Sequence, residues 1–154
     1  MLKQLFIQNY TLIDKLDISF AHGFSVITGE TGAGKSIMLG AIALLLGQRA
    51  DSKVIRNGEL KCVIEATFGL DNPQAVTLLR EFDEESDGHE CIIRRELLAS
   101  GKSRAFINDS PAPLSVLKDL GEMLLDVHSQ HKNLLLNQAD FQLNVLDTLA
   151  HNEQ

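Results

Sequence analysis

The sequence predicts an α/β fold in which a glycine-rich loop joins an apolar segment to an apolar helix. Three observations lead to this prediction. Segments within residues 5–28 alternate apolar and polar residues or are largely apolar, as strands do. The loop at 29–34 continues into an apolar stretch of helical length at 37–46. Residues 90–108 have the pattern of a β-hairpin with its turn near 100–102.

The N-terminal part is predicted to form three strands and one buried helix. Alternating residues at 5–7 and 16–20 predict two half-buried strands, and the more apolar segment 24–28 predicts a central strand. The helix that begins near Ser36 is apolar nearly all round, and Gly47 is placed to end it. We therefore expect other elements to cover most of this helix.

The elements that follow are predicted from the same periodicities. Residues 63–68 read as a strand, and 75–82 carry a short helical pattern before an acidic loop at 83–88. After the hairpin, leucines at helical spacing predict a short helix over 114–120. The apolar residues of 123–127 then predict a last strand.

Composition is ordinary for a soluble globular domain. The chain has 154 residues, of which 44% are hydrophobic and 23% charged, and its formal net charge is −7. The acidic balance argues against a strong electrostatic clamp for DNA in this chain alone. No apolar run approaches the roughly 20 residues that a membrane span requires, and the first residues do not predict a signal peptide. Two cysteines fit a reduced, cytoplasmic protein.

Residues 29–36 match the phosphate-loop pattern G-x-x-x-x-G-K-[ST] completely. Glycines in such a loop let successive backbone N–H groups turn inward around phosphates, and the N-terminus of the following helix adds its positive end. Lys35 is placed to reach the β- and γ-phosphates, and the Ser36 hydroxyl to ligate Mg²⁺. The predicted nucleotide-binding residues are Gly29, Glu30, Thr31, Gly32, Ala33, Gly34, Lys35, Ser36 and Ile37.

The loop alone does not identify the reaction. No N-K-x-D element follows it, which weakens a GTPase interpretation, and no apolar strand ends in an acid that completes a Walker B site. The best strand-end acid is Asp126. One alternative is a stand-alone P-loop nucleotide kinase or small nucleotide-binding regulator, which needs an acceptor site and a second acidic metal ligand. Another is a structural module that uses the loop only to hold a phosphate.

Four segments together resemble motifs of SMC-like ATPase heads, and within that family the RecN group of bacterial DNA-repair proteins. The similarity runs from about residue 2 to about residue 149, with the motifs in matching order at 5–13, 28–37, 44–51 and 125–131. It implies lobe I of a split head of the ABC/SMC type, in which a P-loop NTPase core carries an antiparallel β subdomain.

The resemblance also divides the chain. Residues 1–136 correspond to the head lobe with its phosphate loop and Q-loop, and 137–154 to the start of a helix that leads toward a coiled coil. That helix is predicted to begin at Asn137, and its pattern is incomplete at Gln154. We therefore expect the sequence to stop within a helix and not at a finished domain boundary.

The resemblance assigns roles to individual residues. Gln130 takes the place of the Q-loop glutamine, which contacts the metal together with Ser36 and helps to position the attacking water. Asn9 matches a position near the nucleotide, and Arg49 and Arg56 occupy the polar loop after the phosphate-loop helix. Three positions depart from the family pattern where an aspartate, a glycine and a glutamate are usual: Gly40, Ser129 and Lys132.

The resemblance implies ATP and Mg²⁺ as cofactors and also names what the chain lacks. The signature motif, the Walker B aspartate, the catalytic glutamate and the switch histidine belong to a second lobe, and none is found in these 154 residues. The implied partners are that C-terminal lobe, a second copy joined through an ATP sandwich, and DNA, in a nucleoid-associated protein of double-strand break repair and recombination. The chain alone is expected to bind ATP weakly and to hydrolyse it negligibly.

Overall fold

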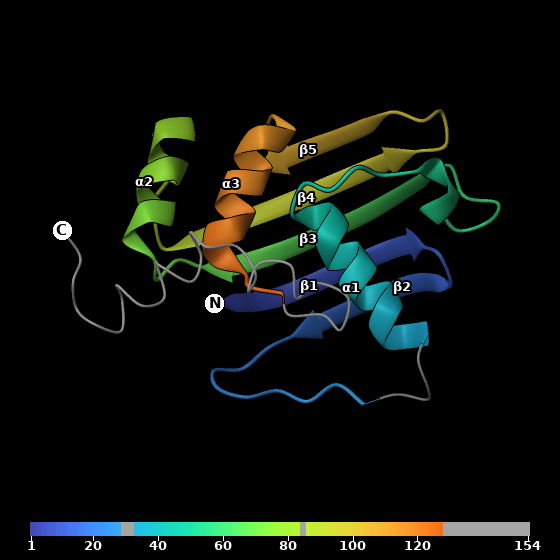
Figure 1. Cartoon of the computed structure of the whole chain (residues 1–154), viewed down its shortest axis with the longest axis horizontal. Coiled ribbons are helices and arrows are strands. Elements are labelled where there is room, and N and C mark those ends of the chain that lie inside the picture. The colour runs from blue at the N-terminus through green and yellow to red at the C-terminus, as the bar shows by residue number, and fades with distance from the viewer. Residues whose placement is uncertain (29–32, 84–85, 128–154) are drawn as a thin grey trace, which may run out of the picture.

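The described residues form one antiparallel sheet with three α-helices against one of its faces (Figure 1). The computed structural model describes residues 1–28, 33–83 and 86–127. The sheet has six strands in the order β2-β1-β3-β4-β5-β6. The strands are β1 (Leu2–Tyr10), β2 (Ile13–Ser19), β3 (Lys61–Gly69), β4 (Glu90–Leu98), β5 (Ser103–Ile107) and β6 (Ser110–Pro111). The helices are α1 (Ala33–Leu45), the 3₁₀ turn η1 (Ser52–Val54), α2 (Pro73–Phe82) and α3 (Leu114–Leu124).

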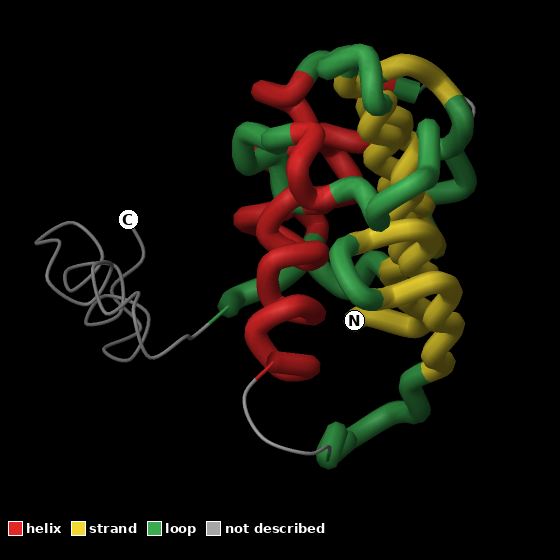
Figure 2. Tube along the Cα trace, turned by 90° about the vertical axis from the view of Figure 1, so that its right-hand side faces the viewer, coloured by secondary structure: helices red, strands yellow, loops and turns green. Residues whose placement is uncertain are grey.

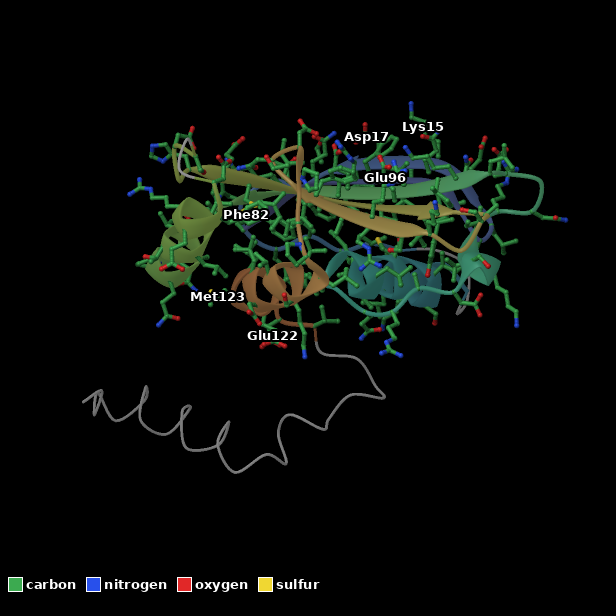
Figure 3. The ribbon with its side chains drawn as sticks, turned by 90° about the horizontal axis from the view of Figure 1, so that it is seen from above. Lys15, Asp17, Phe82, Glu96, Glu122 and Met123 are labelled. Carbon is green, nitrogen blue, oxygen red and sulfur yellow. The ribbon has the colours of Figure 1, made fainter. Side chains whose placement is uncertain are left out.

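Alternation along each strand separates a helix-covered face of the sheet from an open face. On β3, Cys62, Ile64, Ala66 and Phe68 are buried, while the alternate residues 63, 65 and 67 are half-buried. Charged side chains occupy the opposite face, where Figure 3 shows Lys15 and Glu96 on the side away from the helices. The core therefore lies between the sheet and the helices, as the period-two pattern of the sequence predicts.

The hairpin predicted within residues 90–108 is confirmed as the β4–β5 pair. Glu96 of β4 lies opposite Arg104 of β5, and the strands are joined through residues 99–102. Leu98 donates its N–H to the carbonyl of Lys102, which closes the turn. The helical predictions over 37–46, 75–82 and 114–120 are also confirmed, and each helix is longer than expected.

The central strand predicted over 24–28 is wrong. These residues are in no strand, and they extend from β2 past the sheet toward the start of α1 (Figure 2). Phe24 is 93% exposed and Val26 is 68% exposed. The apolar pattern describes side chains suited to burial, but a strand also needs a neighbour for its backbone hydrogen bonds. No described strand lies beside this segment to supply them.

The last strand predicted over 123–127 is also wrong. Met123 and Leu124 continue α3, and the N–H of Leu125 bonds to the carbonyl of Gly121 at 3.0 Å. Leu117 and Leu120 are fully buried on the face of α3 that packs on the core, and Leu124 packs against the same core. The helical spacing of these leucines therefore outweighs the short apolar run that suggested a strand.

Helix α1 packs on the sheet through one face. Ala41, Leu44 and Leu45 are buried, and the other side chains described in the helix are exposed or half-buried. Gly47 ends the helix as predicted: its φ of 91° is left-handed, and its N–H bonds to the Leu44 carbonyl at 3.2 Å. Other elements therefore cover only one side of this apolar helix, whereas the sequence predicted that most of it is covered. No described helix is long and apolar enough to cross a membrane.

Tyr10 at the end of β1 packs directly against the middle of α1. A Cβ atom added at Gly40 lies only 2.7 Å from the Tyr10 hydroxyl oxygen and 3.8 Å from the ring carbon that bears it. Tyr10 is buried, so its ring has little space into which it can withdraw. The close approach explains why glycine is suited to position 40.

We expect Gly40→Ala to destabilise the protein, because the overpacking cost of about 1–3 kcal/mol exceeds the helix-propensity gain of about 1 kcal/mol. In a Tyr10→Phe background the obstructing oxygen is gone, and the same substitution should become neutral or stabilising. Urea unfolding of the four proteins in this double-mutant cycle measures the change of sign. Gly34→Ala is the control, since no atom of the described residues lies within 4 Å of its added Cβ. A destabilisation of equal size in the Tyr10→Phe background contradicts this account.

Candidate nucleotide site

The described part of the phosphate loop is the first turn of α1. Lys35 and Ser36 lie in this turn, and both are exposed. In the ranges that the structure describes, Lys35 makes no ion pair, and the first turn of α1 contains no acidic residue. Backbone N–H groups, a lysine and a hydroxyl at a helix N-terminus are suited to an anion. The chemistry of this end of the helix therefore fits a phosphate group.

The position of this turn is set by the packing of α1. The helix runs obliquely over the sheet, and its first turn lies toward the β2 edge (Figure 1). At its other end, Leu46 packs against Gly121 of α3, and Gly47 lies against the backbone of Leu114. Lys35 and Ser36 are thus carried on a helix that is anchored mainly through its second half.

Asn9, the weaker candidate from the sequence, is held in the structure by the loop that precedes β3. Its φ is 55°, a left-handed conformation that asparagine tolerates better than most residues. Its side-chain amide donates to the Lys61 carbonyl at 3.1 Å and to Glu59 Oε2 at 3.3 Å. Its own carbonyl accepts the N–H of Arg56 at 2.9 Å. Through these hydrogen bonds Asn9 links the end of β1 to residues 56–61. This structural role explains an asparagine at position 9 without a contact to nucleotide.

The two candidate arginines have different environments. Arg56 is half-buried and forms an ion pair with Asp14, with Nη1 and Oδ1 2.8 Å apart. Arg49 lies exposed just after α1. The structure does not bring either arginine into contact with Lys35. Their roles near a nucleotide remain predictions.

Several predicted site residues lie outside the described residues. These are the loop residues Gly29, Glu30, Thr31 and Gly32, and the Q-loop residue Gln130 with the neighbouring departures from the family pattern, Ser129 and Lys132. For Ala33 the structure gives only the backbone at the start of α1. Asp126, the strand-end acid of the sequence, follows α3 and not a strand.

Both cysteines are buried thiols. Burial raises the pKa of Cys62 to about 11, and it raises the pKa of Cys91 to about 12 with a contribution from the negative charge of Asp83. A thiol must ionise to act as a nucleophile or metal ligand. Neither cysteine is therefore suited to chemistry near neutral pH.

Sequence reasoning missed Arg95, whose guanidinium is buried against the C-terminal end of α1. Its Nη1 lies 3.1 Å from the Leu44 carbonyl oxygen and 3.4 Å from that of Gln48, and its Nη2 lies 2.7 Å from Ser103 Oγ. A signal was present in the alternation of β4, where Cys91, Ile93, Arg95 and Leu97 occupy the inward positions. A charged residue in an inward register marks a buried polar contact.

The fold and this site define a class of protein: the N-terminal lobe of an ATPase head of the ABC/SMC type. Solved structures support the fold. An SMC ATPase studied for its ATP-driven dimerisation and DNA-stimulated activation matches with a TM-score of 0.66 and 20% identity, over 94% of this chain and 96% of that one. The SMC head domain from Thermotoga maritima matches with a TM-score of 0.59 and 22% identity, over 77% of this chain and 41% of that one.

The chain belongs to the RecF/RecN/SMC N-terminal domain family, whose model matches residues 1–134. It is 45% identical over 150 residues to the DNA repair protein RecN of Vibrio cholerae, with 97% of this chain aligned. It is 39% identical over 151 residues to that of Bacillus subtilis, again with 97% aligned. The chain spans only 27% and 26% of the length of these two relatives. The predicted fold class and family resemblance are confirmed.

We expect neither thiol to react with an aromatic disulfide reagent at pH 8 while the protein is folded. With pKa values of about 11 and 12, few thiolates form at that pH, and the buried sulfur atoms are also shielded from the reagent. Because the pKa values are raised, ionisation and reactivity should increase only toward strongly alkaline pH. Absorbance of the released thiolate measures the reaction, and both thiols should react in denaturant. A native thiol that reacts at pH 8 as fast as in denaturant contradicts the burial.

Proposed function

We propose that this chain is the ATP-binding N-terminal lobe of an SMC-like ATPase head in a protein of DNA double-strand break repair and recombination. The observation that carries the proposal is the complete phosphate-loop motif, which leads into the exposed first turn of α1 within this fold. The similarity to proteins named DNA repair protein RecN supports the process. A match to the family model over residues 1–134 does not favour a stand-alone kinase or regulator.

In this proposal the first turn of α1 and the loop before it hold the triphosphate of ATP. Lys35 pairs with the β- and γ-phosphates, the Ser36 hydroxyl ligates Mg²⁺, and the glycine-rich backbone donates its N–H groups. The exposed Lys35 and the absence of an acidic residue in the first turn of α1 fit such a ligand. Bound Mg²⁺ neutralises charge on the phosphates, and Gln130 is proposed to position the attacking water. Asn9 remains a proposed peripheral contact.

A second lobe is proposed to cover the apolar surface that this chain leaves open. The surface comprises the exposed segment 24–28 and the outward side of α1. Phe24 and Val26 carry the apolar pattern of a strand without a partner strand among the described residues. We propose that residues 1–136 form the lobe, that 137–154 begin the connection to a coiled coil, and that the second lobe supplies the missing catalytic groups.

The remaining partners follow from the same proposal. Two such heads sandwich ATP between them, and head engagement acts on DNA in the whole protein, located in the cytoplasm at the nucleoid. The net charge of −7 agrees with a chain that does not hold DNA by electrostatic attraction alone. In this scheme the chain by itself binds ATP without appreciable turnover.

We expect Mg·ATP to bind this chain with weak affinity, and Lys35→Ala to lower that affinity at least about tenfold, because a charge-assisted contact to the phosphates is lost. Calorimetric titration measures both affinities, and release of phosphate measures turnover, expected to be negligible. Lys102→Ala is the matched control, since it removes the same charge at the exposed β4–β5 turn. Equal affinities of Lys35→Ala and the original chain contradict the proposed role of Lys35 in binding. Turnover by the original chain that Lys35→Ala abolishes contradicts the expectation that the isolated chain is inactive.

A chimaera tests the second lobe, with this chain in place of the matching 150 residues of the Vibrio cholerae relative. We expect Val26→Asp to abolish ATP turnover of the chimaera, because a buried unpaired carboxylate prevents the two lobes from packing. The same change in the isolated chain should leave its urea unfolding midpoint nearly unchanged, since Val26 is exposed there. Leu60→Asp, at a residue of similar exposure outside the segment, serves as the control. Equal turnover in both chimaeric variants contradicts the assignment of this surface.

A further inference from the structure

Arg95 is a buried cation whose partners are uncharged. The residue is 1% exposed, and no salt bridge joins it to a carboxylate within the described ranges. Its neighbour Arg94 points to the open face of the sheet and forms ion pairs with Glu65, Glu96 and Asp109. Burial without a counter-charge lowers the pKa of Arg95 from its usual value. Such a charge is costly to bury unless several acceptors compensate it.

Two of its three acceptors are carbonyls at or just after the C-terminal end of α1, and the third is a hydroxyl on β5. The guanidinium donates to the carbonyls of Leu44 and Gln48 through Nη1 and to the hydroxyl of Ser103 through Nη2. The Leu44 carbonyl belongs to the last turn of the helix and also accepts the N–H of Gly47. The final carbonyls of a helix carry its negative end, where a cation is favourable. Helix α1 has no basic residue of its own in its last turn.

We infer that Arg95 is a positioning residue for the nucleotide site: it fixes the C-terminal end of α1 to the β4–β5 hairpin and thereby sets where Lys35 and Ser36 lie. The inference rests on the proposed function. Helix α1 has 13 residues. At a rise of about 1.5 Å per residue its ends are about 20 Å apart, so a tilt of about 5° at the anchored end moves the phosphate-binding turn by roughly 2 Å. A displacement of that size weakens contacts whose geometry is as demanding as that of a phosphate loop.

The test compares Arg95→Met, Arg95→Lys and the control Arg104→Met in the full 154-residue chain. Methionine keeps apolar volume and removes the donors, lysine keeps a charge and one donor group, and Arg104 is an exposed arginine on β5. Mg·ATP affinity is measured by calorimetry, the fraction folded by urea unfolding, and the protection of the α1 amides by hydrogen exchange. Lys35→Ala is included as the reference for loss of the nucleotide site.

We expect Arg95→Met to weaken Mg·ATP binding of the folded protein roughly tenfold and to accelerate amide exchange in the last turns of α1 more than in β3. Lysine should restore part of the affinity and of the protection, and Arg104→Met should change neither. A role in stability alone would lower the urea midpoint and leave the affinity of the folded fraction unaltered. Where Arg95→Met does not fold, Ser103→Ala removes one partner of the guanidinium, and a weaker affinity with faster α1 exchange is again expected.

The outcomes separate this inference from the proposed function. Affinity within about twofold of the original for Arg95→Met, with binding still dependent on Lys35, overturns the positioning role and leaves the proposed function intact. Binding by the original chain that does not depend on Lys35 overturns the proposed function in this chain. In that event hydrogen exchange still tests whether Arg95 fixes the C-terminal end of α1. Unchanged protection of the α1 amides in Arg95→Met shows that it does not.

Discussion

The structure depends on the packing of α1 against the covered face of the antiparallel sheet. Ala41, Leu44 and Leu45 are buried there in the same core cluster as Ile64 and Ile93. Each buried leucine or isoleucine contributes about 1.5–3 kcal/mol by leaving water. The first turn of α1, where phosphate binding is proposed, makes no comparable contribution, because Lys35 and Ser36 are exposed. The site is therefore held in place by the other end of its own helix, and its geometry reflects the quality of that distant packing.

Much of this arrangement could be predicted because its signals are local. Neighbouring residues determine the backbone conformation in three such cases. These are the two-residue period of β3, the hairpin around 100–102 and the glycine at position 47. The phosphate-loop motif is local in the same sense, since its pattern lies within the consecutive residues 29–36. The segment 24–28 shows the limit. Its apolar residues indicate a surface to be buried, but whether it pairs depends on a partner that its own sequence does not contain.

The contacts that adjust the site could not be predicted, because they join residues far apart in the chain. The fit of Tyr10 into the space left by Gly40 joins positions 30 apart, and the bond from Arg95 to the Leu44 carbonyl spans 51. Sequence alternation places Arg95 on the inward face but does not say which acceptors it finds there. The resemblance to a family likewise identifies Gln130 by its motif and says nothing of its geometry in this chain.

The charges at the two ends of α1 differ in a way that connects the fold to the proposed ligand. The helix has neither an acidic residue in its first turn nor a basic residue in its last. At the C-terminal end the missing cation comes from β4, where Arg95 is held in the core by three hydrogen bonds. At the N-terminal end Lys35 increases the positive charge of the helix terminus. Arg95 thus compensates the negative end of the helix dipole, whereas the first turn of α1 holds no acidic residue of its own. That arrangement suits the phosphate proposed to bind there.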